Sequence, residues 1–179
     1  MEYNSIADIY SANNKIADGM AHTVATITAA EADAEIEGEK WTVAALVEHV
    51  AIVESNMAKL CSKLLAGAKQ SGKMSDGSFA LSPELAAKFV AGAEAKIEAP
   101  EFVRPQGGVA IAESIEKLNK SATALDALRP DFETVDVSDT KFPHPFFGDL
   151  TAAEWLLLSG GHKMRHIKQI ERLLLKVRQ

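Results

Sequence analysis

The spacing of the apolar residues constrains the fold of this chain more than any other feature of its sequence. Along four long stretches they recur at steps of three and four, which is typical of a helix with one buried face. Alanine is abundant and alternating β-branched runs are scarce, so these stretches do not favour strands. Four helices with one apolar face each predict an all-α four-helix bundle. A length of 179 residues suits a single domain, which we expect over residues 1–179.

Local signals place the ends of these helices. We expect the four long helices over residues 4–30, 42–66, 109–128 and from 150 to the C-terminus. Thr42 is a typical cap for the second helix, and Gly67 is a typical stop after it. Pro130 ends the third helix, because the residue before a proline disfavours helical angles. Thr151 and Glu154 form a capping box, which makes the start of the last helix the best marked in the chain.

A shorter helix interrupts this plan between the second and third long helices. Ser82 followed by a proline is a helix start, and the pattern predicts a helix over about 83–98. The segment 67–108 is therefore an insertion that carries one extra short helix. The acidic stretch 31–40 and the long connection 131–148 are expected to be loops. Long loops inside compact domains are often functional.

Composition and charge exclude several classes of protein. The chain has 19 Lys and Arg against 25 Asp and Glu, a net charge of −6, which argues against nucleic-acid binding and against docking on an anionic membrane. No apolar run approaches the roughly 18 residues that a membrane span needs. The first residues lack the pattern of a secretory signal, so we expect a cytoplasmic protein. Cys61 is the only cysteine, so an intrachain disulfide and a multi-thiolate metal site are excluded.

Three of the five histidines lie where the helical pattern calls for apolar residues. His49 interrupts the apolar stripe of the second helix, and His162 and His166 share the buried face of the last helix at positions i and i+4. Three buried neutral imidazoles need several hydrogen-bond partners, whereas one divalent metal ion satisfies all three. Three histidines with one open position form a ligand set of catalytic zinc, and imidazole also suits nickel, iron and copper. The spacing leaves open that these are ordinary core histidines, since nothing local proves that the two helices are neighbours.

Other catalytic motifs are missing around these histidines. Lys163 stands where the zinc-protease motif H-E-x-x-H carries its Glu, and no Glu-x-x-His occurs to support a di-iron centre. Nucleotide-binding glycine motifs and the G-x-S-x-G elbow are also absent from the sequence. The pair Gly160–Gly161 inside the last helix either admits close packing or a ligand, or is a helix weakness that packing offsets.

A few polar residues near the histidines are candidates for contact with a substrate. By helical geometry Asn56 lies on the same face as His49, where it either bonds a ligand, orients a histidine or packs inside the bundle. Arg165 lies close to His162 around the last helix and is placed to bind a substrate anion. His144 lies between two prolines, for which a structural role in the loop is expected rather than that of a fourth ligand. No general base can be assigned.

Three segments carry a resemblance to a known family. They are WTVAALVEHVAIVESN, APEFVRPQGG and HPFFGDLTAAEWLLLSGGHKMRHIKQIERL. Together they resemble the DinB/YfiT-like superfamily of metal-binding four-helix bundles, in element order over nearly the whole chain. The family pattern of one His on the second helix and HxxxH on the last falls on His49, His162 and His166. The resemblance therefore implies a divalent transition metal, such as zinc, nickel or iron, held by these three residues.

The same resemblance implies an activity. Characterised members of this superfamily include thiol-dependent S-transferases and a mycothiol-dependent isomerase, and some members are called metal-dependent hydrolases. We therefore expect a metal-dependent thiol S-transferase or hydrolase with a small-molecule substrate and a low-molecular-weight thiol cosubstrate. The alternative is a non-catalytic metal-binding protein of stress response or interaction, because no acid or base partner is identifiable. Relatives often dimerise, which makes a homodimer an expectation. The insertion 67–108 departs from the simplest family pattern and is placed to lie over the pocket.

Overall fold

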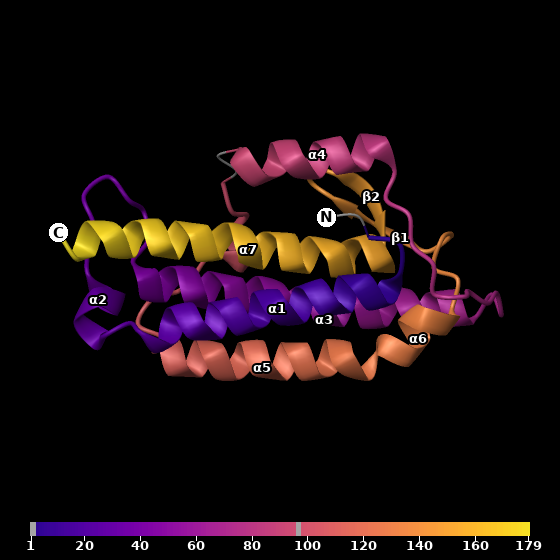
Figure 1. Ribbon diagram of the computed structural model, residues 1–179, viewed down its shortest axis with the longest axis horizontal. Coiled ribbons are helices and arrows are strands. Elements are labelled where there is room, and N and C mark those ends of the chain that lie inside the picture. The colour runs from indigo at the N-terminus through magenta and orange to yellow at the C-terminus, as the bar shows by residue number, and fades with distance from the viewer. Residues whose placement is uncertain (1–2, 96–97) are drawn as a thin grey trace.

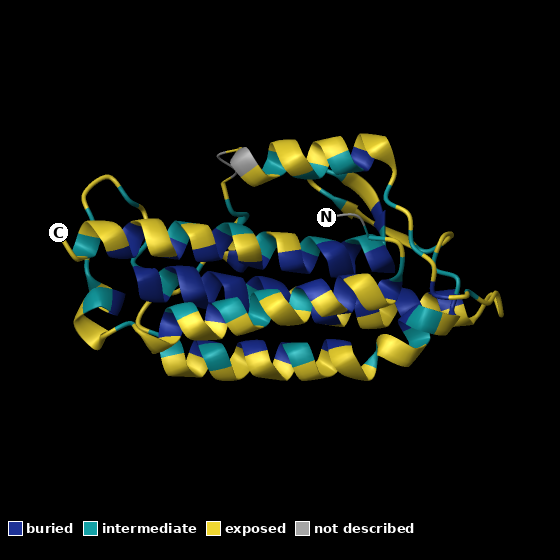
Figure 2. Cartoon of the chain, in the orientation of Figure 1, coloured by how far each residue is buried: buried dark blue, intermediate teal, exposed yellow. Residues whose placement is uncertain are grey.

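The computed structural model describes residues 3–95 and 98–179, and its four long helices run side by side (Figure 1). These helices are α1 (Ile6–Ala25), α3 (Val43–Lys69), α5 (Ile111–Ala127) and α7 (Ala152–Val177). Helix α3 packs against α5 and α7, and α7 also packs against α1. Buried residues concentrate on α3 and on the inward side of α7, drawn dark blue in Figure 2. The predicted all-α bundle is confirmed.

The capping signals place two of the helix starts correctly. The Thr42 hydroxyl accepts a hydrogen bond from the backbone N–H of Ala45 at the start of α3. At the start of α7 the Thr151 hydroxyl accepts from the N–H of Glu154, and the Glu154 carboxylate accepts from the N–H of Thr151 at 2.7 Å. Gly67, however, does not end α3, which continues to Lys69. The prediction of a stop there is wrong, because a glycine inside a packed helix costs only about 1 kcal/mol.

The first predicted helix is too long at its C-terminal end. Helix α1 ends at Ala25, and a second short helix, α2 (Ala29–Asp33), follows after a break. The break arises because Thr28 and Glu31 form a capping box of their own, which starts a new helix. The acidic stretch 31–40, expected to be a loop, therefore begins inside α2.

The insertion between α3 and α5 holds the expected short helix, α4 (Pro83–Glu94), and a single turn, η1 (Glu101–Val103). Ser82 caps α4 and a proline occupies its first turn, as predicted. The helix ends before the expected residue 98, and residues 96–97 lie outside the described part. Helix α4 stands apart from the bundle beside α7 (Figure 1). Its Phe89 contacts Phe147 with ring centroids 4.9 Å apart, so the insertion is fixed to the segment before α7.

The long connection 131–148 is not a loop throughout. A short helix, α6 (Arg129–Thr134), follows α5 directly, with Pro130 in its first turn. Strand β1 (Lys141–His144) then pairs antiparallel with β2 (Gly148–Thr151), in the register Lys141↔Thr151. Gly148 adopts a φ of +82°, which a glycine accommodates readily after the tight turn. This hairpin, the only sheet in the described part of the chain, leads straight into α7.

The pair Gly160–Gly161 has two different environments on α7. A Cβ atom on Gly160 would collide with the Asn13 side chain of α1, whose Nδ2 donates to the Leu156 carbonyl at 2.9 Å. A Cβ atom on Gly161 would meet open space. The close-packing interpretation is therefore correct for Gly160, which lets α1 approach α7.

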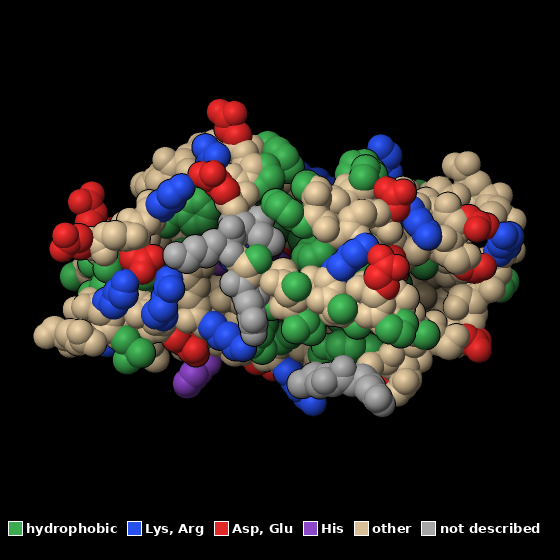
Figure 3. All heavy atoms as spheres, turned by 90° about the horizontal axis from the view of Figure 1, so that it is seen from above, with side chains coloured by type: hydrophobic (Ala, Val, Ile, Leu, Met, Phe, Trp, Pro, Cys, Tyr) green, Lys and Arg blue, Asp and Glu red, His purple; other side chains and the backbone are tan. Residues whose placement is uncertain are grey.

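The face that carries α4 exposes hydrophobic side chains among scattered charges (Figure 3). Val90 of α4 is 68% exposed, and Phe146 at the hairpin turn is 53% exposed. This apolar surface is compatible with the homodimer expected from the sequence, which stays a prediction. No described helix combines the length and the apolar composition needed to cross a membrane.

Candidate metal centre

The three predicted histidines come together between α3 and α7. The ring centroid of His49 lies 5.2 Å from that of His162 and 4.9 Å from that of His166, and the latter two are 4.5 Å apart. One nitrogen of each ring lies within 4.8 Å of the corresponding nitrogens of the others. His49 and His166 are buried, and His162 is partly exposed. Because α3 and α7 are neighbours, the convergence that spacing could not prove is present.

The ring of His49 is held by a backbone carbonyl. Its Nδ1 lies 2.7 Å from the carbonyl oxygen of Val103 in η1. A carbonyl only accepts, so Nδ1 carries the hydrogen and the lone pair of Nε2 stays free. The ring of Trp41 also packs against His49, with centroids 4.9 Å apart. Such a partner on the far nitrogen fixes the orientation of a metal-binding imidazole.

The other two rings leave buried nitrogens without a partner. The Nδ1 of His166 lies 3.0 Å from Oε1 of Gln169, so its N–H donates to that amide oxygen. The Nε2 of His166 and the Nδ1 of His162 are buried and have no hydrogen-bond partner. An unsatisfied buried polar atom costs about 1–3 kcal/mol. A divalent cation shared by the three rings would take up these lone pairs, so the residues present fit a metal ion.

The three rings are neutral near pH 7. Burial, followed by the charge of the other histidines and of Arg165, lowers the pKa of His166 to about 3 and that of His162 well below its ordinary value. Burial also lowers the pKa of His49, against the opposing effect of its bond to Val103. The neutral imidazole is the form that binds metal, so no proton has to leave at neutral pH.

Two polar residues were predicted to lie beside the three histidines. Arg165 does lie near them, whereas Asn56 is not buried with them. The charge of Arg165 lowers the pKa of all three histidines, and its Nη2 donates to the Ala95 carbonyl at 2.8 Å, just beyond α4. Asn56 is exposed, so the prediction that it shares the buried face of His49 is wrong. Helical geometry gives the direction of a side chain, whereas its burial depends on which neighbouring segment covers that level of the helix.

His144 lies in the hairpin, near the centre but outside the group of three. Its ring stacks on Phe147 at 4.5 Å and packs against Trp155 at 5.2 Å. Its Nδ1 accepts a hydrogen bond from the N–H of Phe146 inside the turn. Burial lowers the pKa of His144 to about 4, so the ring is neutral. These contacts agree with the structural role expected for this residue.

A buried ion pair on the two helices that carry the histidines was missed by the sequence reasoning. Nζ of Lys163 lies 2.8 Å from Oε1 of Glu54, and the two residues are only 7% and 2% exposed. The pair joins α3 to α7, the same two helices that carry the histidines. Burial raises the pKa of Glu54, and the charge of Lys163 partly offsets this. The only signal in the sequence was an acid beside the apolar stripe of α3, and such a residue normally belongs to a solvated face.

Comparison with known proteins places the chain in a family. The model of the DinB superfamily matches residues 15–170, which include the three histidines and most of the bundle. No match was found among the curated proteins or the solved structures. The match covers far more than half of the chain. The chain belongs to the DinB superfamily.

Proposed function

We propose that this protein is a metal-dependent enzyme that transfers a low-molecular-weight thiol to an electrophilic small molecule. The observation that supports this best is the group of three neutral imidazoles, in which His162 and His166 from α7 have unpartnered buried nitrogens and face His49 from α3. Three donors leave a tetrahedral ion one open position, which is the arrangement of a catalytic rather than a structural site.

The donor set favours a borderline divalent ion. All three donors are imidazole nitrogens, and no described Cys, Asp or Glu joins the group. Such a set suits zinc, nickel or iron better than magnesium or calcium, which prefer oxygen ligands. A divalent ion bound there would lower the pKa of a thiol or a water molecule in its open position, which supplies a nucleophile at neutral pH.

The charges around the centre favour an anionic ligand. Burial lowers the pKa of the three histidines most, and the charge effects that add to it come from one another, from His144 and from Arg165, with none from a described carboxylate. A divalent ion added to Arg165 would leave an excess of positive charge. We therefore assign Arg165 the binding of an anionic group of the thiol, such as a carboxylate. Asn56, exposed on α3, stays a prediction for substrate contact.

The proposed reaction is a displacement at carbon. The thiol loses its proton to solvent, its sulfur forms a bond to the electrophilic carbon, and the leaving group departs with the electrons of the bond that breaks. The chain's own part is to hold three neutral donors, to bind the anionic end of the thiol through Arg165, and to limit water with the aromatic contacts of His144, Phe147 and Trp155. If water takes the place of the thiol, the same site supports hydrolysis.

A non-catalytic metal-binding role is the second candidate. The observation in its favour is that, among the described residues, no Asp, Glu or Cys joins the group of donors and could act as an acid or base. The transfer reaction does not strictly require one, because the proton of a bound thiol is already acidic. Turnover therefore decides between the two candidates.

The test starts with protein purified without a histidine tag. We expect about one equivalent of a transition metal, or its uptake on titration, and a melting temperature that rises with metal concentration. His49→Ala and His166→Ala should lose both, whereas His22→Ala, at an exposed histidine of α1, should keep both. Less than a tenth of an equivalent in the wild type, with no uptake, would reject the metal site.

The second step tests turnover with a panel of thiols. Glutathione, bacillithiol and mycothiol are each offered with monochlorobimane as the electrophile. We expect turnover with at least one thiol, its loss in His49→Ala and His166→Ala, and an increase of KM for the thiol in Arg165→Met with a smaller change of kcat. A metal-loaded protein that is silent with every thiol would favour the non-catalytic role.

A further inference from the structure

The segment 99–108, here called the strap, lies against α3 and is bound there by two consecutive residues. The Nδ1–H of His49 donates to the Val103 carbonyl at 2.7 Å. The two carboxylate oxygens of Glu48 accept from the backbone N–H groups of Gln106 at 2.9 Å and Gly107 at 3.0 Å. One residue of this pair is a proposed metal ligand, and the other binds the same strap a few residues further along.

Within the strap, short-range bonds hold the turn that carries Val103. The N–H of Val103 donates to the Pro100 carbonyl, and Nε of Arg104 donates to the Ala99 carbonyl at 3.0 Å. Beyond them, Gly107 adopts a φ of +81°, a conformation that a residue with a side chain adopts at a cost. The Val103 carbonyl lies three residues before Gln106, the first of the two backbone groups that Glu48 binds, so the two anchor points are joined by a short length of chain.

Apolar packing holds the strap at Val103, which belongs to the hydrophobic core, but not along its whole length. Val103 is buried, but its neighbour Phe102 is 76% exposed. A cleft of about 680 Å³ opens between the strap, α3 and α5, and Glu48, Phe102 and Arg104 are among the residues that line it. Glu48 is nevertheless only 6% exposed. Its two hydrogen bonds are charge-assisted, which makes them stronger than neutral ones.

We infer that Glu48 is a positioning residue of the metal centre. It holds the strap so that the Val103 carbonyl keeps His49 in the Nδ1–H tautomer, with Nε2 directed at the other two rings. Glu48 itself does not join the group of donors. Partners that orient a metal-binding histidine typically change metal affinity by about 10- to 100-fold when they are removed. The inference rests on the proposed metal site, but the state of the His49 ring can be measured without metal.

The test compares three variants. Glu48→Gln keeps the shape of the side chain and replaces one acceptor with a donor, which cannot bind a backbone N–H. Gly107→Ala weakens the same hydrogen bonds from the strap side and changes no residue of α3. Glu101→Gln is the control, because it removes one negative charge from an exposed residue of the strap that makes no side-chain ion pair in the described structure. Circular dichroism of each metal-free variant reports whether the bundle is intact.

Two measurements are made on each folded variant. Nitrogen-15 NMR of the imidazoles at pH 8, without metal, gives the tautomer of His49. Competition with a chromophoric chelator gives the Kd for Zn²⁺. We expect Glu48→Gln and Gly107→Ala to lose the single Nδ1–H tautomer and to weaken zinc binding by about 10-fold or more, whereas Glu101→Gln stays within twofold of the wild type.

The outcomes separate this inference from the proposed function. If the wild type binds no zinc, the metal site is rejected, and the tautomer of His49 still tests the role of Glu48. If a folded Glu48→Gln variant keeps the tautomer and binds zinc as the control does, the inference is overturned. If Glu48→Gln fails to fold, Gly107→Ala takes its place in the test. The inference is overturned if the folded Gly107→Ala variant keeps the tautomer and binds zinc as the control does.

Discussion

Two histidines of the centre differ in the kind of acceptor that binds their ring N–H. His49 uses a backbone carbonyl as the acceptor for its N–H, whereas His166 uses the side chain of Gln169. In both rings the bonded nitrogen is Nδ1, so Nε2 stays free of a hydrogen bond. A backbone acceptor cannot be removed by substitution, but a side-chain acceptor can, which makes Gln169 a direct probe of the centre.

We predict that Gln169→Leu weakens metal binding. Its hydrocarbon side chain leaves the His166 N–H without an acceptor, and loss of such a partner typically costs about 10-fold or more in metal affinity. Gln169→Glu supplies a stronger acceptor and should bind zinc at least as tightly as the wild type. The Kd for Zn²⁺ measures both. Equal affinity for the Leu and Glu variants would mean that this hydrogen bond does not orient the ring.

The two adjacent glycines of α7 provide a matched pair of substitutions. Gly160→Ala pushes against Asn13, whose bond to the Leu156 carbonyl then breaks, whereas Gly161→Ala meets open space and gains helix propensity. We expect the free energy of unfolding of Gly160→Ala to be lower than that of Gly161→Ala by about 1–3 kcal/mol. Urea denaturation measures the difference. Equal stability of the two variants would show that α1 can move away from α7 freely.

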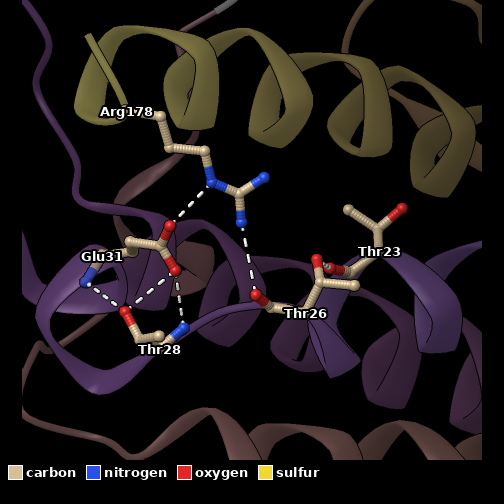
Figure 4. Close-up of polar contacts among 5 residues, drawn as sticks. All are labelled: Thr23, Thr26, Thr28, Glu31 and Arg178. Atoms are coloured by element: carbon tan, nitrogen blue, oxygen red, sulfur yellow. Dashed lines mark hydrogen bonds and ion pairs between the residues drawn. The ribbon is translucent and has the colours of Figure 1, made fainter.

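At the level of elements, polar contacts link the short helix α2 to the C-terminal end of α7. Figure 4 shows Arg178, just after α7, between two residues near α2. Its Nε donates to the Glu31 carboxylate at 2.7 Å, and its Nη2 donates to the Thr26 carbonyl. The bond from Arg178, followed by those from Thr28, lowers the pKa of Glu31 to about 2. The ion pair thus links the end of α7 to the start of α2.

This link predicts a pH-dependent contribution to stability. The pKa of Glu31 is lowered on folding from 4.5 to about 2, so the stabilisation is complete above about pH 4.5 and is lost as the pH falls towards 2. Arg178→Gln should melt a few degrees at most below the wild type at pH 7, because surface pairs contribute little. The difference should shrink below pH 4.5.

The control for this prediction is Lys15→Gln, which removes a positive charge from an exposed residue of α1. Its melting temperature relative to the wild type should not follow the titration of Glu31. If both variants show the same pH profile, the effect is one of net charge, and the contact at α2 does not contribute.

For the whole molecule, the interface between α3 and α7 carries both the histidines and the ion pair of Glu54 with Lys163. Lys163→Met leaves the buried carboxyl of Glu54 alone, and breaking a buried pair in this way typically costs about 3–5 kcal/mol. The double variant Glu54→Leu with Lys163→Met removes both charges and should recover most of that loss. Denaturant unfolding measures each variant.

The double variant also tests whether the ion pair of Glu54 with Lys163 affects metal binding by the three histidines. If the ion pair sets the register between α3 and α7, the double variant should be stable but should bind zinc more weakly. The reason is that a shift between the two helices moves His49 away from its position opposite His162. Full stability with unchanged zinc affinity would show that apolar packing alone sets the register. A double variant as unstable as Lys163→Met alone would contradict the expected recovery of stability when both charges are removed.

Local pattern was enough to predict the four helices, the caps at Thr42 and Thr151, and the location of three histidines on buried faces. Each of these depends on residues within a few turns of one another, and a helix imposes its period on any such segment. The same reasoning failed where local signals were weak or competing. Gly67 did not end α3, and a second capping box at Thr28 divided the first helix.

Only the tertiary structure decided which faces meet. It placed α3 beside α7, brought the Val103 carbonyl to His49, paired Glu54 with Lys163 and left Asn56 exposed. Periodicity gives the direction of a side chain from its own helix, but contacts between distant segments depend on how whole helices and connections pack. A charged residue that is buried against a partner on another helix cannot be told from a residue of the solvated surface when only the sequence of its own helix is considered.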